Sequence, residues 1–162
     1  MSILRLVAEL NLPDHYVAAG FVRNMVWDHL FNTNTLLNDV DVIFYDPDDK
    51  EHYIESTAQS TLEKLDPSIK WQVKNQAFMH VRNGDPNYSC CADAMSYWPE
   101  KETAVAVKLV ADGQIEVCAP FGVQSLIDGK LSYNPKRTRA VFHQRLEKKQ
   151  WLNIWPKLRA VE

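Results

Sequence analysis

Two carboxylates have the spacing in this 162-residue chain that most directly suggests chemistry. Asp39 and Asp41 alternate with valines at the start of an apolar run that ends at Tyr45. Successive side chains of a β-strand point to opposite faces, so both acids are expected on one face. Adjacent carboxylates repel each other, and a divalent cation such as Mg²⁺ or Mn²⁺ would relieve that repulsion through hard oxygen ligands. The pattern favours a metal site; the alternative is a pair of ordinary acids at a strand end.

A glycine between a short apolar segment and a helical pattern precedes the acids. Residues 16–19 are apolar, Gly20 follows, and apolar residues then recur at helical spacing up to Leu30. Glycine lets a backbone approach a phosphate closely, and the free amides of a helix N-terminus attract anions. We expect a tight turn at Gly20 that contacts phosphates, or else a plain helix-start glycine.

The elements that would position these residues alternate along the chain. An α/β or α+β fold is therefore expected, with a mixed sheet, helices packed against it and one domain spanning residues 1–162. Hydrophobic periodicity and turn residues predict helices over 3–10, 21–30, 48–65, 90–98 and 138–149, the third capped by Asp48, and strands over 16–19, 39–45, 69–74, 103–109 and 114–118.

Composition excludes several classes of protein. The net charge of −3 argues against non-specific coating of nucleic acid, which needs a basic face. The three cysteines form no CxxC pair, so neither a structural zinc site nor a disulfide framework is expected. The N-terminus does not read as a signal peptide, and no apolar run could span a membrane. A soluble cytoplasmic protein is expected.

Several motifs, taken in order, resemble a known family. They are AAGFVRNMVWDHL, DVDVIFYD, WQVKNQAFMH, DAMSYWPEKETAVAVKL and CAPFGV. From about Gly20 to Trp155, the chain resembles a bacterial family of nucleotidyltransferase proteins within the DNA polymerase beta-like superfamily. The resemblance implies the nucleotidyltransferase fold, with Asp39 and Asp41 as the catalytic, metal-binding pair.

The resemblance also assigns nucleotide-binding candidates. Gly20 matches the first glycine of the superfamily motif, while Arg23 and Asn24 belong to the close family's RN-x-x-WD pattern, which Trp27 and Asp28 complete. Arg23 could instead pair with Asp28 or Asp39, and Trp27 is expected in the core. Further along, Lys74 and Asn75 are candidates in a polar cluster that also holds Gln76 and His80.

Two departures from the superfamily pattern bear on catalysis. Phe21 replaces the second small residue of the glycine motif. Active members also have a third carboxylate on the next strand, which acts as a base. The matching strand here has no acid, and Asp93 or Glu116 would have to approach from elsewhere.

Two functions remain open from the sequence. The first is a metal-dependent nucleotidyltransferase that moves a nucleoside monophosphate from a nucleoside triphosphate to an unidentified acceptor. A small molecule is favoured over long nucleic acid as acceptor, and no membrane is involved. The alternative is a catalytically weak or inactive nucleotide-binding module with the same fold; a structural role in a larger complex is a weaker third hypothesis. The basic run 136–149 is either a solvated helix face or an edge that binds an anionic acceptor.

Overall fold

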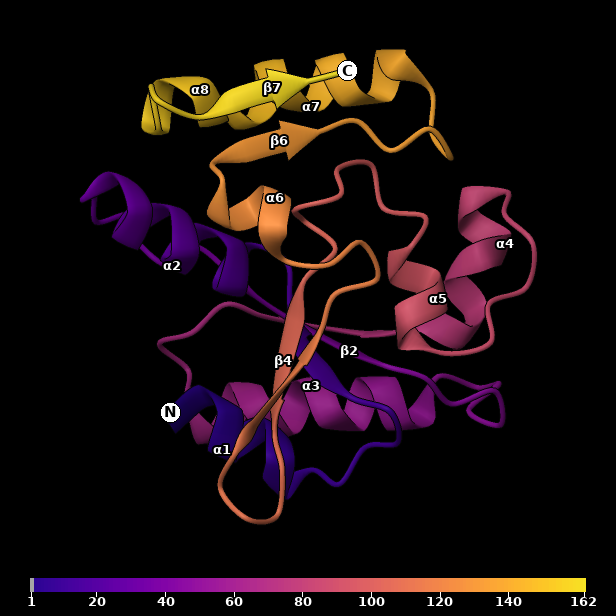
Figure 1. Cartoon of the computed structure of the whole chain (residues 1–162). Coiled ribbons are helices and arrows are strands. Elements are labelled where there is room, and N and C mark those ends of the chain that lie inside the picture. The colour runs from indigo at the N-terminus through magenta and orange to yellow at the C-terminus, as the bar shows by residue number, and fades with distance from the viewer. Residues whose placement is uncertain (1) are drawn as a thin grey trace.

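A five-stranded mixed sheet forms the centre of the computed structural model, which describes residues 2–162 (Figure 1). The strand order is β3-β2-β1-β4-β5. Strand β2 runs parallel to β3, whereas β1 is antiparallel to both of its neighbours, β2 and β4. The strands are β1 (Tyr16–Ala18), β2 (Val40–Phe44), β3 (Trp71–Asn75), β4 (Ala106–Leu109) and β5 (Ile115–Cys118).

The main core lies between one face of this sheet and two helices. Strand alternation directs Val17, Val42 and Val73 to this face, where they pack with residues of α1 (Ser2–Glu9) and α3 (Tyr53–Leu65). Figure 1 shows both helices below β2. The periodicity in the sequence predicted both helices, and apolar burial at this interface holds the sheet in place.

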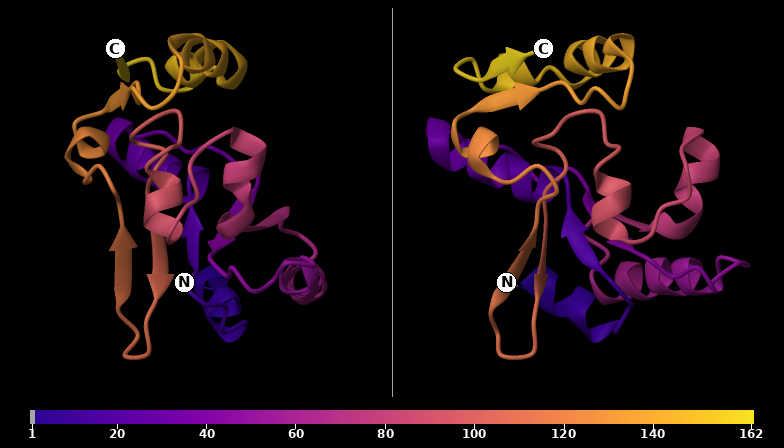
Figure 2. Two further views of the ribbon diagram at one scale, coloured as in Figure 1. Left: turned by 90° about the vertical axis from the view of Figure 1, so that its right-hand side faces the viewer. Right: turned by 45° about the vertical axis from the view of Figure 1, so that its right-hand side comes forward.

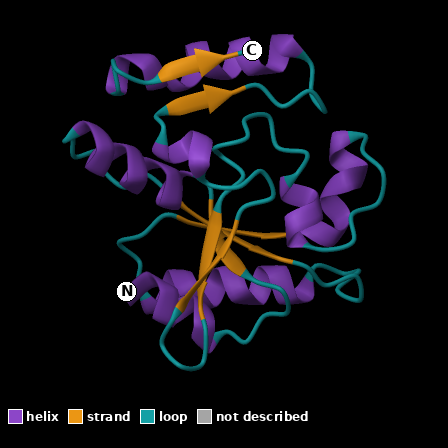
Figure 3. Cartoon of the chain, viewed as in Figure 1, coloured by secondary structure: helices purple, strands orange, loops and turns teal. Residues whose placement is uncertain are grey.

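The opposite face of the sheet has a smaller core. Tyr16, Ala18 and Ile43 pack there against Cys91 and Met95 of the short helix α5 (Cys91–Met95). A 3₁₀ turn (Gln76–Phe78) and helix α4 (Met79–Asn83) precede α5 and lie beside it (Figure 3). Helix α2 (Gly20–Phe31) lies against β2, the strand at whose start the two acids stand.

The C-terminal part forms a layer of its own at one end of the molecule (Figure 2). Here β6 (Lys130–Ser132) pairs in parallel with β7 (Arg159–Val161). Helices α7 (Arg139–Lys149) and α8 (Trp151–Ile154) connect the two strands, and α6 (Gln124–Ile127) leads into β6. The side chains of Trp27 and Trp155 pack edge to face, with ring centroids 5.1 Å apart, and join this layer to α2. No helix in the described range 2–162 has the length and apolar character that a membrane span requires.

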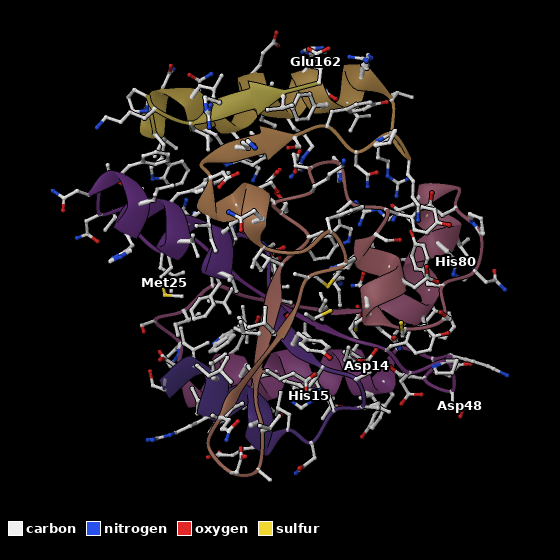
Figure 4. The ribbon with its side chains drawn as sticks, viewed as in Figure 1. Asp14, His15, Met25, Asp48, His80 and Glu162 are labelled. Atoms are coloured by element: carbon white, nitrogen blue, oxygen red, sulfur yellow. The ribbon has the colours of Figure 1, made fainter. Side chains whose placement is uncertain are left out.

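Two local predictions need correction. Asp48 does not cap a helix: it lies in an exposed loop (Figure 4). The carboxylate of Asp49 instead accepts bonds from the amides of Ile54 (2.9 Å) and Glu55 (3.1 Å), so α3 begins only at Tyr53. The strands β6 and β7 were not predicted.

Candidate nucleotide-binding site

The predicted acidic pair lies at the start of β2. Asp39 immediately precedes the strand, and Asp41 is its second residue. Burial and the nearby charge of Asp39 raise the pKa of Asp41 from 3.8 to about 6, while Lys149, Arg23 and Arg145 oppose that rise. Burial and a neighbouring carboxylate both disfavour the ionised form of Asp41, and a bound cation would stabilise that form.

The donor set fits a hard divalent cation that retains other ligands. Two carboxylates supply oxygen atoms, and Mg²⁺ usually completes its coordination with water and substrate phosphates. Within residues 2–162, no group of three or more His, Cys, Asp or Glu side chains is arranged to hold a metal ion. Asp39 and Asp41 would therefore hold a metal together with a substrate, rather than form a closed protein site.

The turn before α2 is made by Ala19 rather than by Gly20. Ala19 adopts φ 56° and ψ −122°, an unfavourable backbone conformation for a residue with a side chain. Its amide donates to the carbonyl of Val105 (2.9 Å), and its carbonyl accepts from Val22 (3.2 Å) and Arg23 (2.9 Å). These bonds hold a conformation that costs on the order of 1–3 kcal/mol. The sequence had predicted this turn at Gly20, one residue after its actual position.

Gly20 is the first residue of α2, and the side chains of Arg23 and Asn24 lie within van der Waals contact of the position that a Cβ would take there. A Cβ built on Gly20 would approach no atom closer than 3.7 Å, the nearest being Nη2 of Arg23. The first amides of a helix have no acceptor within the helix. The helix start therefore presents free amides and a guanidinium to the same space, an arrangement suited to an anion.

Arg23 is a buried cation, with only 6% of its surface exposed. Nη1 donates to the Thr103 hydroxyl (2.7 Å), and both Nε (3.2 Å) and Nη2 (2.9 Å) donate to the side-chain oxygen of Asn24. Its guanidinium lies over the ring of Trp151, 4.6 Å from the centroid. None of the ion pairs within residues 2–162 includes Arg23, contrary to the alternative that it pairs with Asp28 or Asp39.

Burial lowers the pKa of Arg23 to about 10, so the side chain remains charged at neutral pH. Two of its five N–H groups remain for a ligand after the bonds to Thr103 and Asn24. A buried cation that keeps donors free is suited to a phosphate, which matches planar guanidinium donors well.

Asp28 organises the loop that leads to Asp39. One of its oxygens accepts from the Trp155 indole (2.9 Å), and the other accepts from the Thr35 amide (2.9 Å). The hydroxyls of Thr33 and Thr35 also donate to it, both at 2.7 Å. These bonds lower the pKa of Asp28 despite partial burial. Trp27 is fully buried, as predicted. Trp27 is thus a core residue, and Asp28 fixes the loop before Asp39.

Helix α7 adds two cations that the sequence did not assign to this site. Lys149 and Arg145 lie close enough to Asp41 to lower its pKa. Lys149 lines a cleft of about 430 Å³ together with Gly20, Arg23, Asn24 and Asp39. Only the basic character of residues 136–149 hinted at this placement, because nothing in the sequence shows that α7 lies near Asp41.

Lys74 and Asn75 differ in their relation to the acidic pair. Lys74 is exposed, pairs with Glu55 (2.8 Å) and lines a second cleft of about 270 Å³ that also contains Asp41. Asn75 is 1% exposed and bonds to the backbone of Asp46 and Ala77. Through these bonds its side-chain amide joins the ends of β2 and β3. Asn75 lines neither of the two clefts.

Comparison with known proteins supports the inference drawn from this geometry. A family model described as Nucleotidyltransferase matches residues 5–160. The chain belongs to this nucleotidyltransferase family. Comparison with curated protein sequences gives no match.

Solved structures with the same fold are described as CCA-adding enzymes. One, an NMR structure described as a CCA-adding enzyme head domain, is 31% identical, with a TM-score of 0.85 over 99% of this chain and 87% of that one. Complexes of CCA-adding enzyme with CTP and with ATP are each 14% identical, with TM-scores of 0.59 and 0.56. This chain spans only 40% and 38% of those proteins, and at this identity they show the fold alone. The predicted nucleotidyltransferase fold is thus confirmed.

The position next to the acidic pair in this nucleotidyltransferase is an amide. Gln72 of β3 is in register with Asp41, and its Nε2 donates to Asp39 (2.8 Å). The sequence had pointed to Lys74 and Asn75 on this strand, but the pairing places Gln72 beside the acids. As the sequence indicated, β3 has no carboxylate that could act as the third acid of the superfamily pattern.

Neither alternative acid reaches the pair. Asp93 lies in the first turn of the short helix α5, where its carboxylate accepts from the amide of Ser89 (2.9 Å). Glu116 lies on β5, three strands from β2, and pairs with Lys108 (2.9 Å). His80, on α4 (Figure 4), bonds to the carbonyl of Ala77 (2.8 Å), as expected for a structural histidine.

Proposed function

We propose that this chain is a metal-dependent nucleotidyltransferase that transfers a nucleoside monophosphate from a nucleoside triphosphate to an acceptor. One observation carries the proposal: Asp39, the open N-terminus of α2 at Gly20 and the buried cation Arg23 all face one cleft. A triphosphate and a divalent ion together need these three features, namely oxygen ligands, amide donors and a compensating charge.

The residues of the chain would divide the task. Asp39 and Asp41 would hold Mg²⁺ or Mn²⁺, which supplies charge neutralisation and orients the phosphates. Amides at Gly20 and the free N–H groups of Arg23 would donate to phosphate oxygens, with Asn24 fixing the guanidinium. Phosphoryl-type transfer depends mainly on such positioning and charge stabilisation. Asn75 has no part in this proposal.

Lys149 adds an exposed positive charge at the rim of the same cleft. Because its ammonium group is a point charge on a flexible side chain, a lysine there can contact the triphosphate as it binds and the pyrophosphate as it leaves. The relatives solved with CTP and with ATP support a nucleoside triphosphate as the ligand.

Calorimetry with each of the four nucleoside triphosphates, with and without Mg²⁺, tests the proposal. Binding should require Mg²⁺, and Asp41→Asn should weaken it by at least about tenfold, as expected when a metal ligand is removed. Asp93→Asn is the control, because Asp93 lies in the first turn of α5 and its carboxylate accepts from Ser89. Magnesium-independent binding, or equal binding by Asp41→Asn, would contradict the metal assignment.

The binding-module alternative rests on Gln72. An amide cannot accept a proton from an attacking hydroxyl, so a reaction that needs such a base would be slow or absent. Mass spectrometry of reactions with candidate acceptors separates the two functions. Magnesium-dependent binding without transfer to any acceptor would favour the module.

A further inference from the structure

The two carboxylates of the acidic pair line two different clefts. Asp39 lines the cleft that contains Gly20 and Arg23, whereas Asp41 lines the cleft of about 270 Å³ that contains Gln72 and Arg145. A transfer between two substrates needs the attacking group on the side opposite the leaving group. If the first cleft holds the triphosphate, the second is placed to hold the acceptor.

The second cleft contains no group suited to deprotonate an acceptor. Among the residues 2–162, its lining includes one acid, Asp41, which the proposed function uses to hold the metal. Gln72 donates its amide to Asp39. Glu100 is fully buried, and both of its oxygens accept from Arg145 (2.5 and 3.1 Å). A hydroxyl acceptor would have to lose its proton without help from the protein.

The same cleft is rich in donors for an anion. Arg145 uses Nε and Nη2 for Glu100, and among the bonds within residues 2–162 its Nη1 has no acceptor. Lys74 lines the cleft from β3 with its ammonium group paired to Glu55 (2.8 Å), which leaves two of its three N–H donors for a ligand, and Thr103 also lines the cleft. An arginine with a free edge at the wall of a cleft is suited to bind a phosphate group.

A larger hollow continues this cleft away from the acids. Its volume is about 600 Å³, and Trp98 and Pro99 line both spaces. Lys136 lies there, with Nζ 3.9 Å from the centroid of the Tyr97 ring. Within residues 2–162, no carboxylate forms an ion pair with Lys136. The space suits a small polar molecule longer than a phosphate group alone.

We propose that the acceptor is a small phosphorylated molecule that attacks through its phosphate group, and not through a hydroxyl. This proposal rests on the proposed function, since it assigns the second substrate of the same site. An anionic oxygen of the phosphate monoester forms a bond to the α-phosphorus. The bond from that phosphorus to the bridging oxygen breaks, and its electrons leave with pyrophosphate. The product contains a new diphosphate linkage, and no proton has to be removed from the nucleophile.

The absence of a base and the presence of cations are explained together by this acceptor. A phosphate monoester has its second pKa near 6 and is a dianion above neutral pH. It therefore needs attraction and orientation rather than deprotonation, which Arg145 and Lys74 can provide. A hydroxyl acceptor would instead need a base to remove its proton, and it would need no anion-binding site.

The test compares matched acceptors with the full chain, Mg²⁺ and each nucleoside triphosphate. The phosphates are inorganic phosphate, glucose 1-phosphate and glycerol 3-phosphate; the matched alcohols are glucose and glycerol, and an RNA with a free 3′-hydroxyl is added. ³¹P NMR distinguishes a diphosphate product from a phosphodiester. Diphosphate products, formed at least about tenfold faster than any phosphodiester, are expected because only the phosphates arrive ionised.

Other outcomes separate this inference from the proposed function. Phosphodiester formation from an alcohol or from the RNA overturns the inference and leaves nucleotidyl transfer standing. Magnesium-dependent binding of the triphosphate without product from any of the phosphates also overturns it and favours the binding module. Failure of magnesium-dependent binding overturns the proposed function and, with it, the inference.

Substitution of Gln72 gives an independent readout. Gln72→Glu places a carboxylate beside Asp41 and should raise the ratio of phosphodiester to diphosphate product by at least about tenfold, since a positioned base contributes roughly 10²–10⁴-fold. Gln72→Leu removes the same bond to Asp39 without adding a base and is the matched control. An unchanged ratio in Gln72→Glu would contradict the role assigned to this position.

Discussion

Replacing Asp41 by asparagine should stabilise the metal-free protein while it weakens nucleotide binding. The pKa of Asp41 is raised from 3.8 to about 6, chiefly by burial and then by Asp39. A change of that size corresponds to about 3 kcal/mol of unfavourable free energy for the ionised side chain. Asparagine has nearly the same shape and no charge, so a gain of about 1–3 kcal/mol in unfolding free energy is expected.

The pH dependence of this gain follows from the direction of the pKa change. Because the pKa of Asp41 is higher in the folded state, the folded protein binds the proton more tightly than the unfolded chain does. The contribution of Asp41 to stability therefore falls as the pH rises from 3.8 through about 6. Asp41→Asn should be more stable than the parent protein near neutral pH, and the gain should vanish below about pH 4.

Urea denaturation in the presence of a chelator measures this effect. Unfolding of both proteins at about pH 7.5 and about pH 4 gives the two differences in free energy. Asp48→Asn is the matched control, because Asp48 lies in an exposed loop and should change stability little. Destabilisation by Asp41→Asn near neutral pH, or an equal gain at both pH values, would refute the electrostatic reasoning.

Three further predictions concern residues other than the acidic pair. Asp28→Asn should lower the unfolding free energy by about 2 kcal/mol in thermal denaturation, because one amide or indole donor loses its charged acceptor; a loss below about 0.5 kcal/mol would contradict this. Gly129→Ala should destabilise by more than Gly113→Ala in the same assay: both have positive φ, but only at Gly129 would a Cβ meet an aromatic carbon at 2.7 Å. Arg23→Lys should weaken triphosphate binding by about tenfold in calorimetry despite its retained charge, since lysine lacks the planar donor set; unchanged affinity would exclude Arg23 as a phosphate ligand.

The sequence predicted the elements that carry the acids because their patterns are local. Alternation of acids and valines placed Asp39 and Asp41 on one face of a strand, and helical spacing placed Trp27 in the core. The sequence did not predict the backbone conformation of Ala19, because a hydrogen bond to Val105, a residue far away in the chain, holds it. Local patterns predict which face of a strand or helix a side chain occupies. They do not predict which distant backbone group holds a residue in its conformation.

Contacts between distant segments account for the rest. Arg145 and Lys149 are about a hundred residues from Asp41 in the sequence, and only packing of the C-terminal layer brings them close. Gln72 was overlooked because the register between β2 and β3 decides which residue faces the acids. The strands β6 and β7 have three residues each, too few for a periodic pattern.

Binding of Mn²⁺, followed by electron paramagnetic resonance with a non-hydrolysable nucleoside triphosphate present, tests the central claim most directly. The parent protein should bind Mn²⁺ and the nucleotide cooperatively, since the two carboxylates leave coordination positions for phosphate oxygens. Asp39→Asn and Asp41→Asn should each weaken Mn²⁺ binding by about 10–100-fold. Parental affinity in both variants would show that Asp39 and Asp41 do not hold the metal.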